Sequence, residues 1–121
     1  MSYKIEISDL FEKQSKKLKK KYPSLSQELQ DLLALLISNP FAGTPLGNNI
    51  FKVRLAVKSK GKGKSGGLRV ITYILVSNKI VFLLFIYDKS EISSIKTELI
   101  KKYVLRILDE MKEFPDQRKI N

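Results

Sequence analysis

FKVRLAVKSKGKGKSGGLRVITYILVSNKIVFLLFIY, residues 51–87, contains most of the sheet that can be predicted for this chain. Its first five residues, Phe51–Leu55, alternate apolar and basic side chains, which is typical of a strand with one face in a core and the other in water. We expect Lys52, Arg54 and Lys58 to lie together on the wet face. Because like charges side by side on a sheet repel one another, this face favours a polyanionic partner.

Strands are expected throughout this part of the chain, at about residues 50–58, 68–76 and 79–89, with a tight Ser-Asn turn between the last two. The last strand is apolar on both faces, which is typical of an interior position in a sheet. Alternating apolar and polar side chains predict a further short strand over residues 3–7.

Helical periodicity predicts a helical hairpin before this sheet and one helix after it. We place the helix starts after Ser8, after Ser24 or Ser26, and after Ser93 or Ser94, and the helix ends at Pro23, Pro40 and Pro115. Residues 40–49 contain several helix and strand breakers and are expected to form a loop.

The predicted order of elements is β-α-α-β-β-β-α. We therefore expect an α+β fold in which the helical hairpin and the C-terminal helix pack on an antiparallel sheet. A chain of 121 residues is long enough for a single core. The predicted domain covers residues 1–114, and residues 115–121 are expected to be a frayed tail.

The composition excludes several kinds of chemistry. The chain has no cysteine and no histidine, which excludes disulfides, thiolate catalysis and zinc sites built on Cys or His. We expect neither a metal nor any other cofactor. No apolar run approaches the roughly 20 residues of a membrane span, and no signal-peptide core follows Met1. We therefore expect a cytoplasmic protein that does not contact a membrane.

The positive charge of the chain is concentrated in its sheet. Net charge is +11, and residues 51–90 contain nine basic residues and one acidic residue, Asp88. Solubility alone would explain a scattered excess, but clustering on one strand favours nucleic acid or an acidic protein as partner. A lysine run in the first helix, residues 13–21, is either a solvated face or a contact for rRNA phosphates or for an acidic partner.

Basic side chains from neighbouring strands are expected to meet on one face. Antiparallel pairing can bring Arg69 beside Arg54, with Tyr87 and Lys89 at the end of the last strand. Fixed cations can stabilise the phosphorane formed when an RNA 2′-hydroxyl attacks phosphorus, and a lysine of lowered pKa can act as base. The same residues could also bind nucleic acid without cleaving it. Asp88 either pairs with Lys89 or a neighbouring arginine, or one of the two acids Asp88 and Glu91 moves a proton.

The glycine-rich segment after the first of these strands gives a second candidate contact. Its spacing does not match a phosphate-binding P-loop, because Lys58 stands where the first glycine is required and a strand follows. A basic hairpin could instead track a phosphate backbone, or be a solvated tip. The candidate nucleic-acid contacts are Lys58, Lys60, Lys62, Lys64 and, for base stacking, Tyr73. Ordinary packing is the alternative for Tyr73.

The order of elements, together with Phe51–Arg54, Gly67–Tyr73 and Tyr87–Glu91, resembles the RelE/ParE toxin superfamily. Within it, the RelE- and HigB-like mRNA endonucleases are the most similar. The resemblance covers about residues 3–113. It implies the toxin of a type II toxin–antitoxin pair, which cuts mRNA on the ribosome without metal and is silenced by a small acidic antitoxin.

The resemblance also implies roles for individual residues. Lys52 and Arg54 match the paired basic positions of the family, one of them acting as base, and Arg69 matches the arginine that stabilises the transition state. Tyr87 and Lys89 stand close to the positions where the family has a catalytic tyrosine and a further arginine. A ParE-like inhibitor of DNA gyrase, or an inactive relative that regulates its own promoter with its antitoxin, are the alternatives.

Overall fold

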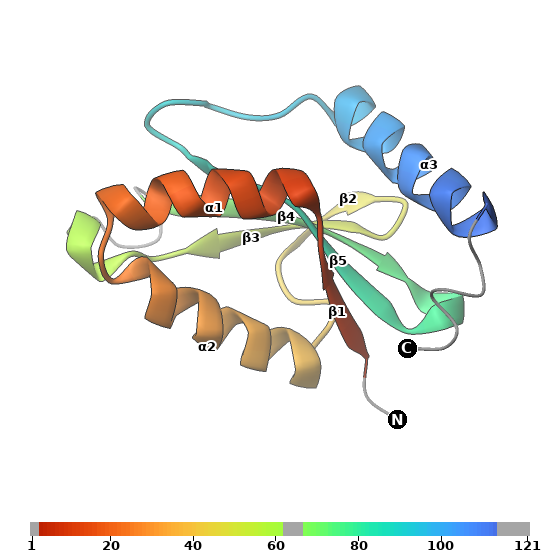
Figure 1. Cartoon of the computed structure of the whole chain (residues 1–121), viewed down its shortest axis with the longest axis horizontal. Helices are drawn as coiled ribbons and strands as arrows, with labels where there is room; N and C mark the ends of the chain where they lie inside the picture. Colours follow the sequence, from red (N-terminus) through yellow and green to blue (C-terminus); the bar gives the residue numbers. More distant parts are fainter. Residues whose placement is uncertain (1–2, 62–66, 114–121) are drawn as a thin grey trace.

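The computed structural model describes residues 3–61 and 67–113. Its elements are shown in Figure 1 and follow in chain order: β1 (Lys4–Ile7), α1 (Asp9–Lys21), α2 (Leu25–Ser38), β2 (Thr44–Gly47), β3 (Ile50–Leu55), β4 (Leu68–Leu75), β5 (Ile80–Asp88) and α3 (Thr97–Glu113). The predicted α+β class, with a helical hairpin and a C-terminal helix on one sheet, is confirmed.

The sheet is mixed rather than wholly antiparallel. The strand order is β1-β5-β4-β3-β2. β1 pairs in parallel with β5, from Lys4 beside Ile80 to Ile7 beside Leu83, whereas the other pairs are antiparallel. Alternation within β1 predicts a half-buried strand but not its partner. Because that partner lies more than 70 residues further along the chain, no local pattern indicates the direction of pairing.

Part of the loop predicted over residues 40–49 is an edge strand. β2 pairs with β3, from Thr44 beside Lys52 to Gly47 beside Ile50, with an irregularity between Pro45 and Gly47. Proline lacks a backbone donor but is tolerated on an edge strand, where one side of the ladder is open. The glycines and the proline therefore shape this strand without preventing it.

Two predicted boundaries were wrong by a few residues. β3 ends at Leu55 instead of near Lys58, because the chain turns into a short 3₁₀ helix at Lys58–Lys60. α3 begins at Thr97 rather than after Ser93 or Ser94. The apolar stripe of α3 reaches the sheet only from Ile100 onward, and the preceding segment runs mostly exposed over the surface.

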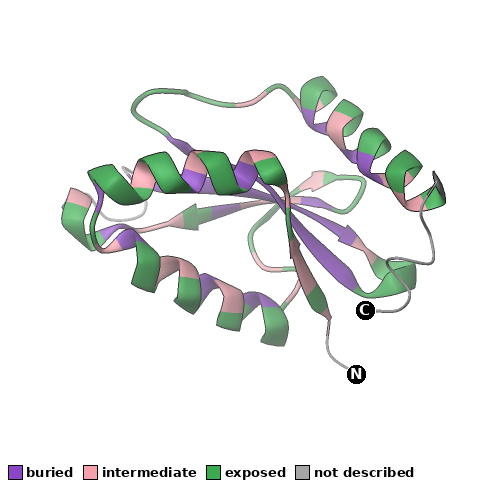
Figure 2. Ribbon diagram, in the orientation of Figure 1, coloured by how far each residue is buried: buried purple, intermediate pink, exposed green. Residues whose placement is uncertain are grey.

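The core lies on both faces of the sheet. α1 and α2 bury Phe11, Leu25, Leu32 and Leu36 against one face, while α3 buries Ile100, Val104 and Ile107 against the other. β5 is buried along its whole length (Figure 2), which confirms the interior position expected for it. Among the described residues, no helix is both long and apolar enough to cross a membrane.

α1 is attached to the sheet at its first turn. The Ser8 hydroxyl accepts a hydrogen bond from the Phe11 amide at 3.0 Å and donates one to the Leu84 carbonyl at 2.9 Å. The predicted N-cap is therefore confirmed, and the same side chain joins the helix start to β5. Gln14, one turn later, accepts a hydrogen bond from the Ile86 amide.

Candidate functional site

Three of the predicted site residues form a row across the three central strands, near one end of each. In the register of β3, β4 and β5, Arg54 lies beside Arg69, and Arg69 lies beside Tyr87. Directly paired residues of antiparallel strands point to the same face. The row lies on the face covered further along by α3, because Tyr87 belongs to the apolar cluster of that face. We call Arg54, Arg69 and Tyr87 the cation row.

The next positions of the same strands continue this face. Lys52 pairs with Ile71 and is half-buried. One step further, Tyr73 pairs with Ile50 and stacks on Phe82, with ring centroids 6.1 Å apart. Tyr73 is only 8 % exposed, so its ring packs in the core beside the site instead of presenting a face for a base.

The cation row runs from solvent into the protein. Arg54 is exposed, whereas Arg69 and Tyr87 are each 3 % exposed. The Arg69 guanidinium donates a hydrogen bond to the Leu68 carbonyl at 3.1 Å. Burial raises the pKa of the Tyr87 hydroxyl above its ordinary value, and the charge of Arg69 opposes that rise. Tyr87 is therefore neutral near pH 7 and available as a hydrogen-bond donor.

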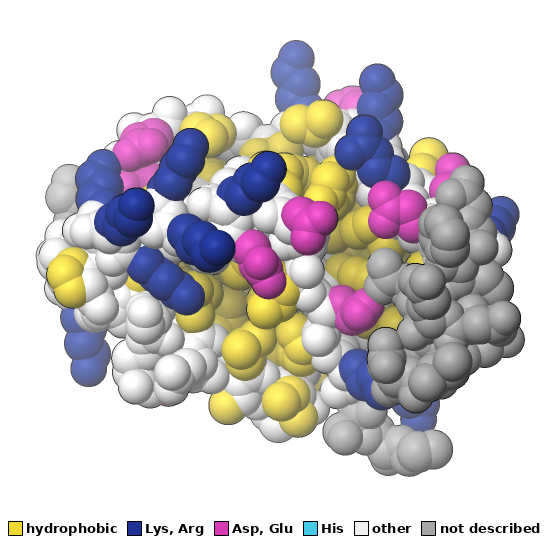
Figure 3. All heavy atoms as spheres, in the orientation of Figure 1, with side chains coloured by type: hydrophobic (Ala, Val, Ile, Leu, Met, Phe, Trp, Pro, Cys, Tyr) yellow, Lys and Arg dark blue, Asp and Glu magenta, His cyan; other side chains and the backbone are white. Residues whose placement is uncertain are grey.

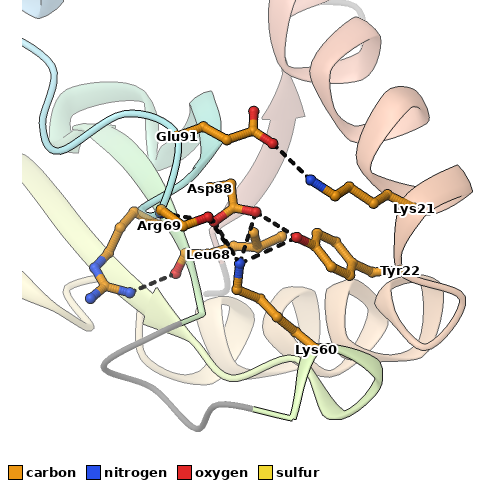
Figure 4. Close-up of polar contacts among 8 residues, drawn as sticks. Lys21, Tyr22, Lys60, Leu68, Arg69, Asp88 and Glu91 are labelled. Atoms are coloured by element: carbon orange, nitrogen blue, oxygen red, sulfur yellow. Dashed lines mark hydrogen bonds and ion pairs between the residues drawn. The ribbon is translucent and has the colours of Figure 1, made fainter.

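Asp88 and Lys60 lie on the other side of the sheet. Asp88 pairs with Leu68, one step along from the Arg69–Tyr87 pair, and its carboxylate accepts the Lys60 ammonium at 2.7 and 2.9 Å. Figure 4 shows the Arg69 guanidinium pointing away from this ion pair. The ammonium of Lys60 is thus held by a carboxylate, a contact that sequence reasoning missed.

A local signal for this pair was present in the sequence. Asp88 is the one acid of residues 51–90, and such an acid among cations commonly pairs with one of them. We expected Lys89 or a nearby arginine as its partner, but the short 3₁₀ helix at Lys58–Lys60 brings Lys60 to it instead. The other proposed proton carrier, Glu91, pairs with Lys21 at 2.9 Å.

The remaining predicted contacts are dispersed. Lys58 is exposed in the 3₁₀ helix, where its amide donates to Glu28 Oε2, so the strand alternation that was expected to align it with Arg54 stops before it. Lys89 is exposed directly after β5. Lys62 and Lys64 fall outside the described residues.

A second basic surface lies on α1. Figure 3 shows lysines gathered over this helix. They are all exposed: Lys13, Lys16, Lys17, Lys19, Lys20 and Lys21. We call these six residues the α1 lysines. Hydrophobic side chains appear beside them in the same view, and the groove between α1 and α2 has a volume of about 430 Å³ and is lined in part by Phe11, Leu29 and Leu33.

Comparison with known proteins assigns the family. The model for the RelE toxin of the RelE/RelB toxin–antitoxin system matches residues 4–114. The chain belongs to the RelE toxin family. It is accordingly a toxin of the toxin–antitoxin type, and the resemblance inferred from the sequence is confirmed.

Solved structures of E. coli RelE share the fold of this RelE-family toxin. A mutant in the free state has 16 % identity and a TM-score of 0.56, covering 88 % of this chain and 99 % of that one. The same mutant in complex with an antitoxin RelBc peptide has 15 % identity and a TM-score of 0.56, covering 85 % and 95 %. The isolated toxin has 17 % identity and a TM-score of 0.51, covering 87 % and 98 %.

Proposed function

We propose that this RelE-family toxin is a ribosome-dependent endoribonuclease that cleaves mRNA and so inhibits translation. The observation that carries the proposal is the cation row, in which three adjacent strands place Arg54, Arg69 and Tyr87 side by side. Two guanidinium groups in directly paired positions of neighbouring strands are suited to contacting the oxygens of one phosphodiester. Half-buried Lys52 adds a further positive charge beside the row.

The proposed reaction is an in-line displacement at phosphorus. A base takes the proton of the ribose 2′-hydroxyl, the 2′-oxygen bonds to phosphorus, and the bond from phosphorus to the 5′-oxygen breaks as that oxygen takes a proton. The products are a 2′,3′-cyclic phosphate, which can open to a 3′-phosphate, and a free 5′-hydroxyl. Negative charge grows on the non-bridging oxygens, and positioned cations stabilise it most at the transition state.

The role proposed for each residue in this reaction follows from its exposure and its chemistry. Arg69, held in a buried position, presents a planar guanidinium suited to two phosphate oxygens. Exposed Arg54 and Lys89 meet the incoming strand, and half-buried Lys52 serves as the base. Tyr87, whose pKa is raised by burial above its ordinary value, is neutral and donates a hydrogen bond or a proton toward the leaving oxygen.

We further propose an acidic antitoxin as the protein partner. The chain carries a net charge of +11, and a structurally similar RelE has been solved with an antitoxin peptide. An acidic segment laid over the basic surface would neutralise it and block RNA at the same time. mRNA on the ribosome and this antitoxin would then compete for the same charges.

The test is cleavage of mRNA on ribosomes programmed in vitro, read by primer extension. The wild type is expected to cut inside codons. Arg54→Ala, at an exposed position, is expected to slow cleavage without altering the fold, whereas Lys101→Ala removes one exposed charge from α3 and is the control. Intact mRNA with wild type would overturn the proposal. Inhibition of gyrase in a parallel assay would then favour the ParE-like alternative, and no effect in either assay would favour an inactive regulator.

A further inference from the structure

Asp88 is the most heavily hydrogen-bonded side chain among the described residues. Besides two contacts with the Lys60 ammonium, its carboxylate accepts the Tyr22 hydroxyl at 2.6 Å and both the amide and the hydroxyl of Ser90, at 2.9 and 2.7 Å. The Lys60 and Asp88 side chains are only 9 % and 1 % exposed. We call Tyr22, Lys60, Asp88 and Ser90 the Asp88 cluster (Figure 4).

The Asp88 cluster ties together segments that are distant in sequence. Tyr22 follows the end of α1, Lys60 lies between β3 and β4, and Asp88 is the last residue of β5. The Lys60 ammonium also contacts the Tyr22 hydroxyl at 3.2 Å and lies 5.2 Å from the centre of its ring. One carboxylate therefore holds the 3₁₀ helix at Lys58–Lys60 against the end of β5.

The cluster lies directly behind the cation row. Successive strand residues point to opposite faces, so Asp88 and Leu68 face the helical hairpin where Tyr87 and Arg69 face the candidate site. Arg69 and Leu68 are linked again by the hydrogen bond from the guanidinium to the Leu68 carbonyl. A shift of Asp88 would consequently move Tyr87, its neighbour on β5. It would also displace Arg69, which pairs with Tyr87 from β4.

We propose that Lys60 and Asp88 are positioning residues, which hold Arg69 and Tyr87 in the geometry required for cleavage. This inference rests on the proposed endoribonuclease function. It assigns Lys60 to the support of the site rather than to the RNA backbone. It also gives neither Asp88 nor Glu91 a part in proton transfer, because the Asp88 carboxylate is buried on the opposite face and is occupied by several donors, and Glu91 is held in an exposed ion pair with Lys21.

Stability alone is a weak explanation for this arrangement. Desolvation of two charges offsets much of their attraction, so a buried ion pair often stabilises a fold no more than an apolar pair of similar volume. The ion pair instead contributes a fixed geometry. Donors from three segments converge on one carboxylate, which fixes the orientation of all of them. Displacing a reacting group by about 1 Å can reduce a rate on the order of 100-fold.

The test compares Asp88→Asn, Lys60→Met and the milder Tyr22→Phe with the control Glu91→Gln. The control breaks the neighbouring ion pair with Lys21, which is more than half exposed and joins the same two segments, α1 and the end of β5. Single-turnover cleavage on programmed ribosomes gives the rate at saturation and the affinity separately. We expect the first two variants to lose between about tenfold and 100-fold in rate, with affinity within about twofold of wild type.

A second measurement does not depend on cleavage. NMR signals of the Arg69 Nε–H group and of the Tyr87 ring should shift or broaden in Asp88→Asn and stay in place in Glu91→Gln. Unmoved signals, or a loss of affinity with an unchanged rate, would overturn the positioning role. If the wild type does not cleave, the proposed function fails while the NMR signals still decide the positioning role. Tyr22→Phe decides the question if Asp88→Asn unfolds.

Discussion

Arg69 illustrates how position changes the meaning of a charged residue. In the sequence it is one of 23 basic residues, but in the fold it is 3 % exposed and lies beside Arg54 and Tyr87. A buried guanidinium is already desolvated and oriented before substrate arrives. A phosphate that reaches it therefore gains more than it would from a flexible lysine at the surface.

Arg69→Lys is predicted to keep the charge and lose most of the activity. Lysine is a point charge and cannot bind two phosphate oxygens in one plane, so transition-state stabilisation should fall and cleavage should slow on the order of 100-fold. Single-turnover rates measure this loss, and a thermal melt checks the fold. A rate within about threefold of wild type would show that the guanidinium geometry is not used.

The Asp88–Lys60 pair makes a prediction about pH. Burial alone would raise the pKa of Asp88, but the hydrogen bonds from Lys60, Tyr22 and Ser90 outweigh it and hold that pKa well below the ordinary 3.8. The hydrogen bond to Asp88 raises the pKa of Lys60 above 10.5 although burial opposes this. The stabilisation is thus present above pH 3.8 for Asp88 and below pH 10.5 for Lys60.

The free energy of unfolding should therefore fall at both ends of this range. As pH decreases through the lowered pKa of Asp88, the carboxylate is protonated and its contribution is lost; as pH increases through the raised pKa of Lys60, the ammonium is lost. Urea unfolding of wild type and Asp88→Asn at a series of pH values measures this. The free energies of unfolding of wild type and Asp88→Asn should become more similar below about pH 4. A constant difference would contradict the assignment.

At the scale of elements, β2 fixes the position of the strand that carries Lys52. Gly43, just before β2, has φ +103°, and a Cβ at this position would lie 2.6 Å from the Lys52 carbonyl oxygen. Only glycine permits such a close approach between these backbones. The segment that was expected to be a plain loop is therefore a support for β3.

Gly43→Ala is predicted to destabilise the protein by roughly 1–3 kcal/mol and to slow cleavage by displacing Lys52. Gly47→Ala is the matched control, since Gly47 also has a positive φ, +92°, but its Cβ would meet nothing within 4 Å. Urea unfolding and single-turnover rates of the two variants separate backbone strain from steric displacement. Equal loss of rate in both would mean that contact with Lys52 is irrelevant.

At the scale of the whole molecule, two groups of basic residues lie on opposite sides of the sheet. The cation row lies on the face of α3, whereas the α1 lysines lie on a helix of the opposite layer, and among the described α1 lysines an ion pair is seen only for Lys21. A net charge of +11 accelerates association with a polyanion, and this effect weakens with salt. We therefore expect the α1 lysines to act in binding to the ribosome and the cation row to act in cleavage.

Replacing Lys13, Lys17 and Lys20 with alanine is predicted to weaken ribosome binding and leave the rate at saturation unchanged. Each lost phosphate contact reduces the magnitude of the slope of log affinity against log salt by about 0.7–0.9, so the loss of three contacts should reduce it by about 2–3 units. Filter binding at several salt concentrations measures the slope. If the slope stays the same while the rate falls, the α1 lysines act on the site and not on docking.

Local periodicity was sufficient for the α+β class, the helical hairpin, the Ser8 cap and the buried character of β5, because each depends on residues close together in the chain. The same alternation predicted that Lys52 and Arg54 share a face. The remaining features of the fold and of the candidate site could not be predicted from local patterns. Long-range contacts determine the parallel union of β1 with β5, the edge strand β2, the burial of Arg69 and the capture of Lys60 by Asp88. These contacts join residues up to about 76 positions apart. Which distant residues meet depends on how the intervening chain folds, so the local sequence around a side chain does not identify its partner.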